Sequence, residues 1–405
     1  MMRTLRFLHL WVGLILGLPL LALGLSGTVL VLEPELRGLF TPSPTAAADT
    51  GAAAHSVAEV VAAATAAAPP GAKPANYAAP TEPGGTATVR FQAPRRAPPG
   101  DAGARPAGEA RGPGGGMPGI SVHIDPVTLA VVRTPGLDAT IGWFHRLHGN
   151  LLIQDRSGRD LVGYLGIVMS ALGITGLVLW WPRPGQWRQA FIVRKAAKGA
   201  RFHRELHGAV GIWGLLVFLV VSVTGVAIAF PQTIAAGVGS ALPMAAQTQG
   251  FAVPKVTPLE GAEPAGVDEA VAVALAALSQ SGPRPGLALR AASLPQSPDQ
   301  AIRVVLAPPG GAMTSAVTLM VDPWTRQVVE VRDPSAQPAG NKVTGWMRPL
   351  HEGEGLGPVY RVLVALSGLL PLLFAITGTS MWWIKRQNRK AGAARAAAIL
   401  QSAAE

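Results

Sequence analysis

The chain has 405 residues, of which 49% are hydrophobic and 14% charged, and its mean hydropathy is +0.32. Charge this scarce is typical of proteins that keep part of the chain in lipid. The absence of cysteine excludes disulfides, iron–sulfur clusters, thiolate zinc sites and covalently attached c-type haem. A metal or cofactor would need histidine, carboxylate, methionine or backbone ligands, and eight histidines are available.

Four uncharged apolar runs are long enough to span a bilayer, which requires about 20 residues. They are Phe7–Leu32, Leu161–Pro182, Gly208–Phe230 and Val362–Ile384. Arg3 and Arg6 precede the first run as in a secretory signal, but the run is too long and no small-residue cleavage motif follows promptly. We therefore expect the first run to be retained and the chain to have four transmembrane helices.

Two long segments, 33–160 and 231–358, separate these helices. Each combines a helical pattern with alternating, strand-like runs, so we expect two α+β modules. The helical stretches are 57–68 and 267–278, and the strand-like ones are 120–133 and 301–332. Residues 69–119 are dense in Pro, Gly, Ala and Arg, a composition typical of disorder.

The distribution of charge predicts the orientation. Residues 1–6, the loop 183–207 and the tail 385–405 hold 14 Lys and Arg against two acidic residues, whereas the remainder holds 20 basic and 21 acidic residues. The positive-inside rule then places both termini in the cytoplasm and both α+β modules outside. These short basic loops lack any helical or aromatic reader, so we expect no nucleic-acid partner.

The second half of the chain repeats the first. Leu8-His9 matches Leu206-His207, and Ser26-Gly27 matches Thr224-Gly225, at an offset of 198 residues. Leu147-His148 matches Leu350-His351 at an offset of 203, and Thr175-Gly176 with Trp180-Trp181 corresponds to Thr377-Gly378 with Trp382-Trp383. Both halves cross in the same direction, which predicts a parallel two-fold repeat.

Six histidines lie at predicted helix ends. His9 and His207 occupy equivalent inner positions, and His148 and His351 occupy equivalent outer positions; His145 and His203 lie one turn before His148 and His207. Two imidazoles approaching from different helices are the ligand set of a b-type haem, and glycines leave room for the flat ring. The sequence therefore predicts an inner haem on His9 and His207 and an outer haem on His148 and His351.

Other roles for these histidines stay open. A single histidine at a membrane interface commonly binds headgroups, and His145 and His203 are second-tier candidates as alternative ligands or as partners of a ligand. Zinc or copper binding at His-x-x-His or His-x-x-x-His is an alternative, but no carboxylate is spaced as in a hydrolase. His55 and His123 lie in the external modules and are not assigned a role.

Several of these motifs resemble the PepSY-associated transmembrane family, which includes iron-regulated inner-membrane proteins and ferrioxamine-type siderophore reductases. They are Leu8-His9-x-Trp11-x-Gly13, Leu147-His148 followed by Gly158-Arg159-x-Leu161-Val162-Gly163, Leu206-His207-x-x-x-Gly211, Asp322-Pro323-x-Thr325 and the Thr-Gly…Trp-Trp helix ends. The resemblance implies a four-helix core in the bacterial inner membrane that binds b-type haem through histidines, with periplasmic PepSY-like modules.

The resemblance also implies an activity, the reduction of ferric siderophore iron by electrons passed outward. Some relatives carry a cytoplasmic flavoprotein reductase domain. About twenty residues follow Ile384, so we expect a separate cytoplasmic or quinol donor. Two other functions stay open: a non-catalytic, membrane-anchored PepSY binding or regulatory protein, and a siderophore or metal transporter.

Overall fold

The computed structural model describes residues 1–40, 54–80, 84–92, 120–132, 135–245, 253–280, 286–308 and 315–402. The chain divides into two compact units, each assembled from segments far apart in the sequence. The helical unit comprises residues 1–33, 143–234 and 347–405, and the sheet unit comprises residues 34–142 and 235–346.

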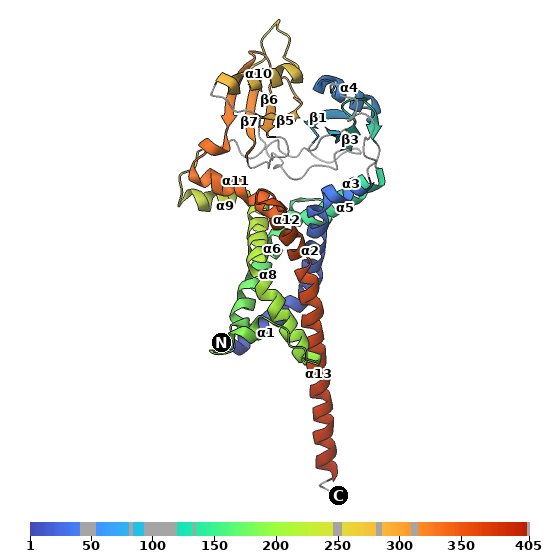
Figure 1. Cartoon of the computed structure of the whole chain (residues 1–405), viewed down its shortest axis with the longest axis vertical. Helices are drawn as coiled ribbons and strands as arrows, with labels where there is room; N and C mark the ends of the chain where they lie inside the picture. The colour runs from blue at the N-terminus through green and yellow to red at the C-terminus, as the bar shows by residue number, and fades with distance from the viewer. Residues whose placement is uncertain are drawn as a thin grey trace, which may run out of the picture. The chain divides into compact units, whose positions relative to one another are not determined.

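The helical unit is a bundle of apolar helices. Its long members are α2 (Gly17–Val31), α6 (Arg156–Trp180), α8 (Gly199–Ala229) and α13 (Leu370–Ser402), which run side by side in Figure 1. α1 (Met2–Ile15), α7 (Trp187–Ala190) and α12 (Gly357–Ser367) complete it, and α3 (Glu33–Phe40), α5 (Pro135–Asn150), α9 (Pro231–Gly239) and α11 (Ala339–Glu352) contain the unit boundaries or adjoin them.

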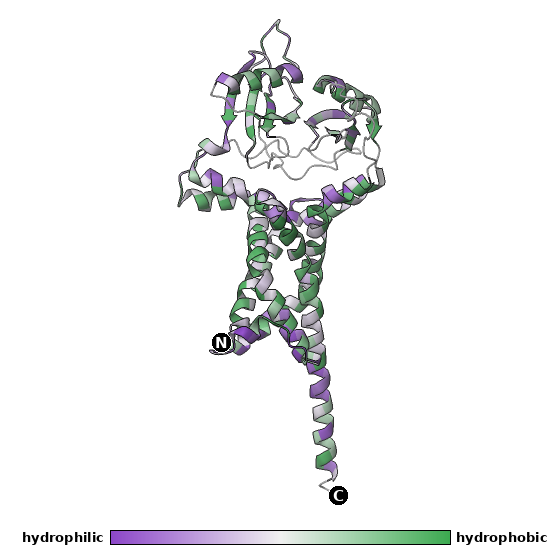
Figure 2. Cartoon of the chain, in the orientation of Figure 1, coloured by the Kyte–Doolittle hydropathy of each residue, from purple (hydrophilic) through white to green (hydrophobic). Residues whose placement is uncertain are grey.

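Three helices within the described residues are long and apolar enough to cross a membrane. They are α6, α8 and the stretch Gly357–Ser402, which is formed by α12 and α13; the bent pair α1–α2 makes a fourth if it is one span. Apolar residues predominate on these helices, whereas the C-terminal part of α13 mixes hydrophilic and apolar residues (Figure 2). Exposing an apolar surface of this length to water is unfavourable, whereas a bilayer covers it, so these helices indicate a membrane protein.

The expectation of one continuous helix over 7–32 is wrong. The structure begins a helix at Met2 and bends it by 64° at Leu16, between α1 and α2. Gly17 and Pro19 explain the break, because glycine is a poor helix former and proline has no N–H to donate to the preceding turn. The bend sets the direction of α1, which carries His9.

Two other helices extend past the apolar runs that predicted them. α8 begins at Gly199, so the last part of the expected loop 183–207 is helical, and α13 continues through the expected tail to Ser402. Hydropathy marks the part of a helix that suits lipid, whereas backbone hydrogen bonds continue through Arg, Lys and Ala, which are good helix formers.

Close backbone contact joins α2 to the α12–α13 pair. A Cβ on Gly24 would overlap the carbonyl oxygen of Gly368, and a Cβ on Gly368 would overlap Thr28 Oγ1. Small residues of this kind let transmembrane helices pack backbone to backbone.

Two equivalent arginines tie the ends of neighbouring helices. Arg159, in the first turn of α6, donates to the carbonyl of Ile228 at the end of α8. Arg361, in α12, donates to the carbonyl of Val31 at the end of α2, at 2.7 Å. A cation at a helix C-terminus satisfies free carbonyls and is favoured by the helix dipole.

The sheet unit contains one antiparallel sheet of eight strands in the order β4-β3-β2-β1-β5-β6-β7-β8. The strands are β1 (Lys73–Ala78), β2 (Ala87–Gln92), β3 (Ile120–Ile124), β4 (Val131–Val132), β5 (Ala288–Ser293), β6 (Ile302–Ala307), β7 (Val317–Asp322) and β8 (Gln327–Arg332). α4 (Val57–Ala67) packs on β1–β4, and α10 (Val267–Gln280) packs on β5–β8 (Figure 1).

The two expected α+β modules thus share a sheet instead of standing apart. β1 and β5 pair through Asn76–Ser293, Tyr77–Ala292 and Ala78–Ala291, which joins the two halves. Left unpaired, each of these strands would present a row of free N–H and C=O groups. Each half keeps its own apolar core, around Phe91 and Ile124 in one and around Leu306 and Leu319 in the other.

The expectation of disorder over 69–119 is wrong for the two segments that form β1 and β2. β2 alternates strictly, with Ala87, Val89 and Phe91 buried and Arg90 exposed. That period of two was obscured by the Pro and Gly around it. Residues 93–119 lie outside the described residues.

Candidate functional site

The four histidines singled out by the repeat lie in two facing pairs in the helical unit. In the first pair, His9 of α1 faces His207 of α8, with ring centres 6.4 Å apart and an interplanar angle of 71°. In the second pair, His148 of α5 faces His351 of α11, with ring centres 5.9 Å apart and an angle of 44°. Each pair therefore takes one histidine from each half of the chain.

A hydroxyl from another helix contacts every one of these rings through Nδ1. The Nδ1 atoms of the first pair lie 2.9 Å (His9) and 2.8 Å (His207) from Thr175 Oγ1 and Thr377 Oγ1. Those of the second pair lie 3.2 Å (His148) and 3.3 Å (His351) from Ser26 Oγ and Thr224 Oγ1. Each histidine and its hydroxyl belong to the same half of the chain.

Main-chain carbonyls also contact the second pair. His148 Nδ1 lies 3.0 Å from the carbonyl oxygen of Leu23, and His351 Nδ1 lies 2.9 Å from that of Val221. Because a carbonyl only accepts, both Nδ1 atoms must carry a proton. A neutral imidazole protonated at Nδ1 has its lone pair at Nε2, free to bind a metal.

The hydroxyls of the first pair lead to the same tautomer. Thr175 Oγ1 is 2.8 Å from the carbonyl oxygen of Ala171, and Thr377 Oγ1 is 2.7 Å from that of Leu373. A hydroxyl has a single proton, and these carbonyls take it, so the oxygen accepts from the imidazole. All four rings thus donate from Nδ1 and direct Nε2 away from their supports.

The spacing of the rings suits a metal ion between them. Two metal–imidazole bonds of about 2 Å, with about 1 Å more from each nitrogen to its ring centre, give about 6 Å between ring centres. Both pairs have this separation. A hydrogen bond from Nδ1 to an outer acceptor is also the usual second contact of a metal-bound histidine.

Glycines beside the pairs leave space that a side chain would fill. A Cβ on Gly27 would lie 3.0 Å from His148 Cε1, and a Cβ on Gly225 would lie 3.0 Å from His351 Cε1. A Cβ on Gly13, one turn beyond His9, or on Gly378 would meet no atom within 4 Å. Gly27 and Gly225 thus admit the imidazole rings of the second pair, Gly13 and Gly378 leave open positions at the first pair, and the Phe374 ring lies 4.7 Å from that of His207.

Burial favours the neutral form of the second pair, which lies on α5 and α11 outside the candidate spans. It lowers the pKa of the His148 imidazole, and it lowers the pKa of the His351 imidazole to about 4. Desolvation has this effect because it disfavours the charged ring. Neutral imidazoles are the form that binds metals.

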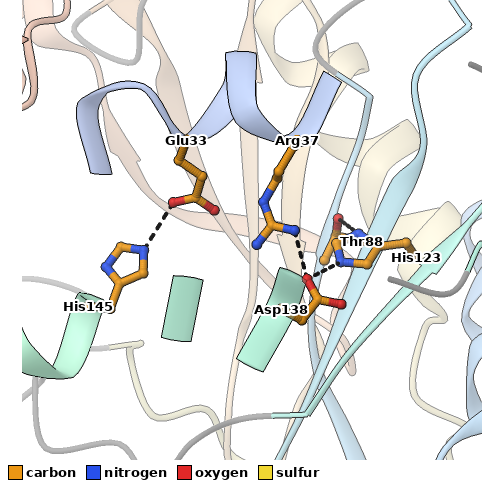
Figure 3. Close-up of polar contacts among 6 residues, drawn as sticks. All are labelled: Glu33, Arg37, Thr88, His123, Asp138 and His145. Atoms are coloured by element: carbon orange, nitrogen blue, oxygen red, sulfur yellow. Dashed lines mark hydrogen bonds and ion pairs between the residues drawn. The ribbon is translucent and has the colours of Figure 1, made fainter. Parts of the chain in front are cut away.

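The second-tier histidines lie apart from these pairs. His145 Nε2 contacts Glu33 Oε2 at 3.1 Å (Figure 3). His203 has its ring against Phe202, and its buried Nδ1 has no hydrogen-bond partner among the described residues. In the same described part of the chain, no group of three or more His, Asp or Glu residues could hold a metal ion.

His123, in the sheet unit, belongs to a polar network of its own. Its Nδ1 lies 3.0 Å from Thr88 Oγ1 and its Nε2 lies 3.4 Å from Asp138 Oδ1, which also pairs with Arg37 at 2.7 Å (Figure 3). Both ring nitrogens are therefore engaged. Burial lowers the pKa of the His123 imidazole, although the Asp138 carboxylate opposes the shift.

Sequence reasoning did not assign the four hydroxyl residues, Ser26, Thr175, Thr224 and Thr377. A signal for them was present, because each is followed by glycine and the Ser/Thr-Gly dipeptide recurs at equivalent places in both halves. Gly27, Gly176 and Gly225 lie beside an imidazole ring, and Gly378 has open space beside it. The hydroxyl that precedes each glycine contacts Nδ1 of a histidine.

Comparison with known proteins agrees with this arrangement of apolar helices and sheet. Residues 6–385 match the family described as PepSY-associated TM region. No curated protein matches the chain. Since the family match leaves out just the first five and the last twenty residues, the chain is a membrane protein that belongs to the PepSY-associated transmembrane family.

Proposed function

We propose that this protein is a transmembrane oxidoreductase with two b-type haems, which moves electrons from the cytoplasmic side to the periplasm and reduces ferric siderophore iron there. The observation that supports this proposal most strongly is the two facing imidazole pairs, each with Nδ1 hydrogen-bonded to a support and with no hydrogen bond to Nε2 among the described residues. Polar side chains buried beside apolar helices and repeated in both halves are energetically costly, which favours a functional role for them.

Four residues would hold the groups: His9 and His207 the first haem, His148 and His351 the second. A haem with two histidine ligands supplies reversible one-electron transfer. The chain would orient each imidazole through the hydrogen bond at Nδ1, and burial favours the neutral form of His148 and His351. Because each ligand pair spans the two halves, it also fastens the halves to one another.

The two pairs are spaced to carry electrons across much of a bilayer. His207 and Val221, whose carbonyl contacts His351, lie 14 residues apart on α8, which corresponds to about 21 Å along the helix axis. A hydrocarbon core is about 30 Å thick. One pair near each surface would therefore divide the crossing into shorter transfers.

The proposed orientation follows the charge asymmetry. Both termini and the basic loop 183–207 would lie in the cytoplasm, with four spans in a parallel two-fold repeat and the sheet unit in the periplasm. The first pair would then receive electrons from a separate cytoplasmic or quinol donor. The second pair would lie near the periplasmic surface, in the inner membrane of a bacterium.

The proposed reaction requires one electron and no proton. The donor loses an electron, and the Fe(III) of the siderophore gains it to become Fe(II). Hard oxygen ligands bind Fe(III) more tightly than Fe(II), so the reduced iron is released.

An absorption spectrum of the detergent-purified full chain, oxidised and reduced with dithionite, tests the haem content. We expect two b-type haems per chain. His207→Ala should remove one, whereas His203→Ala, one turn earlier on α8, should retain both. A folded but colourless protein would reject the oxidoreductase and leave the membrane-anchored binding or regulatory function.

The reductase activity itself requires a separate measurement. In proteoliposomes with a reductant inside and a ferric hydroxamate siderophore outside, Fe(II) capture by a ferrous chelator should depend on the protein. His351→Ala should abolish the signal and His145→Ala should retain it. Transport of intact siderophore into the vesicles without reduction would favour the transporter instead.

A further inference from the structure

The two histidine pairs have different supports. The Nδ1 atoms of His9 and His207 have hydroxyl partners, Thr175 and Thr377, and no carbonyl partner among the described residues. The Nδ1 atoms of His148 and His351 have carbonyl partners at 3.0 and 2.9 Å, and the nearby hydroxyls are farther away, at 3.2 and 3.3 Å.

We propose that Thr175 and Thr377 are positioning residues that fix the tautomer and tune the redox potential of the first pair, whereas the main chain performs this role for the second. This inference rests on the proposed function for its redox part. Its tautomer part concerns the histidines alone.

The threonines suit this role because they have no proton to give to the imidazole. Each hydroxyl donates to the carbonyl four residues earlier in its own helix, at 2.8 Å for Thr175 and 2.7 Å for Thr377. A carbonyl inside a helix already accepts from a backbone N–H and has one lone pair left, which Leu23 and Val221 offer to the second pair but no carbonyl among the described residues offers to the first. A threonine bonded in this way thus provides an acceptor in the middle of an apolar helix.

The second pair uses the same back-bonding but with a different result. Ser26 Oγ donates to the carbonyls of Ala22 and Leu23, at 2.6 and 3.1 Å, and Thr224 Oγ1 donates to those of Val220 and Val221, at 2.7 and 3.1 Å. The carbonyl three residues before the hydroxyl is also the one that receives the imidazole proton. Deleting the hydroxyl leaves that carbonyl in place.

Loss of an acceptor has a predictable effect on a metal ligand. A hydrogen bond from Nδ1 raises the basicity of Nε2, and a more basic ligand stabilises Fe(III) over Fe(II). In the haem-free protein, a buried Nδ1–H without an acceptor is also unfavourable, so the imidazole can adopt the tautomer that is protonated at Nε2. Removing the hydroxyl from the first pair should therefore raise its potential.

Six variants, including matched controls, test the proposal in the full chain. Thr175→Val and Thr377→Val remove the acceptor and keep the shape, and Thr175→Ser and Thr377→Ser restore it. Ser26→Ala and Thr224→Val make the same deletion at the second pair. In Thr175→Val and Thr377→Val, spectroscopic redox titration should show a higher midpoint potential for the first haem. The expected rise is about 59 mV, which for one electron is a tenfold increase in the ratio of Fe(II) to Fe(III).

The serine variants should return to the wild-type potential, and Ser26→Ala and Thr224→Val should shift the second centre less than threefold. The proposal is overturned if the valine variants leave the first centre unchanged, or if the second centre shifts as much. A purely structural threonine would change haem content without changing the potential of the haem that remains.

A measurement without haem separates this proposal from the proposed function. In haem-free protein labelled with ¹⁵N-histidine, His9 and His207 should show protonated Nδ1 and unprotonated Nε2, assigned with His9→Gln and His207→Gln. Thr175→Val should remove the preference at His9, while Ser26→Ala should preserve it at His148. A wild-type His9 protonated at Nε2 would overturn the inference, whatever the haem content.

Discussion

The helical unit and the sheet unit both contain the two halves of the repeat, but they preserve it differently. In the helical unit, equivalent positions keep the same chemistry: His9 and His207 each contact a threonine, and the neighbouring glycines recur. In the sheet unit, the turn residues Asp125 and Asp322 match, each accepting hydrogen bonds from the N–H groups two and three residues later.

Other contacts in the sheet unit have diverged. Asp268, at the start of α10, accepts hydrogen bonds from Val57 N and Ala58 N at the start of α4, and the equivalent position in α4 is Ala58. An apolar core tolerates changes that conserve volume and pattern, whereas a ligand pair requires particular atoms in particular places. The proposed function leads us to expect this difference, because its two ligand pairs lie in the helical unit.

The largest expected effect is the loss of a haem on mutation of a histidine in the helical unit, and a histidine of the sheet unit serves as the control. His351→Ala removes one ligand of the second pair and should eliminate one haem from the spectrum of the purified protein. His123→Ala, in the sheet unit, should retain both haems. Loss of haem in the His123 variant, or retention of two in the His351 variant, would contradict the division between the units.

The free energy of unfolding of the sheet unit should depend on its apolar core, and mutations there should leave the haem content unchanged. Leu319 on β7 is fully buried against α10, so Leu319→Ala should reduce the free energy of unfolding of the sheet unit by about 2–5 kcal/mol. Val329→Ala, at a half-exposed position on β8, should cost far less. Chemical denaturation followed by circular dichroism measures both changes, and the haem spectrum before unfolding should be the same in both variants.

The sequence predicted the features that depend on composition and on exact repetition. Apolar length located α6, α8 and α13, and the repeat indicated which histidines the structure brings face to face. The bend at Leu16 was missed because hydropathy does not register the lost hydrogen bonds around Pro19. A period of 3.6 or 2 describes one element, and it does not report how elements are broken or joined.

The pairing of β1 with β5 and the role of the hydroxyls could not be predicted for a related reason. Both are contacts between residues more than 100 positions apart, such as Tyr77 with Ala292 and His9 with Thr175. The sequence contains the two partners but not their separation in space. An internal repeat supplies part of that information, because equal environments are expected at equal positions.

A smaller effect should follow from filling the space beside a ligand. A Cβ at Gly225 would lie 3.0 Å from His351 Cε1, so Gly225→Ala should displace the ring by a few tenths of an ångström and lower the occupancy of the second haem. Gly237→Ala on α9 is the matched control, since its Cβ would meet no atom within 4 Å. The measurement is haem per chain in the two purified variants. Equal values would contradict the close contact between Gly225 and His351.

The smallest effect concerns pH and the sheet unit. The pKa of His123 is lowered by burial, so the folded state binds a proton there less readily than the unfolded chain, whose histidine pKa is about 6.5. As the pH falls through about 6.5, the unfolded state takes up the proton first and the sheet unit loses stability. The Asp138 carboxylate at 3.4 Å opposes the shift and limits the loss.

His123→Gln keeps a polar side chain beside Thr88 but does not titrate, so its unfolding midpoint should fall less than that of the wild type between pH 7.5 and 5.5. Parallel pH dependence in the two proteins would show that His123 does not carry this effect.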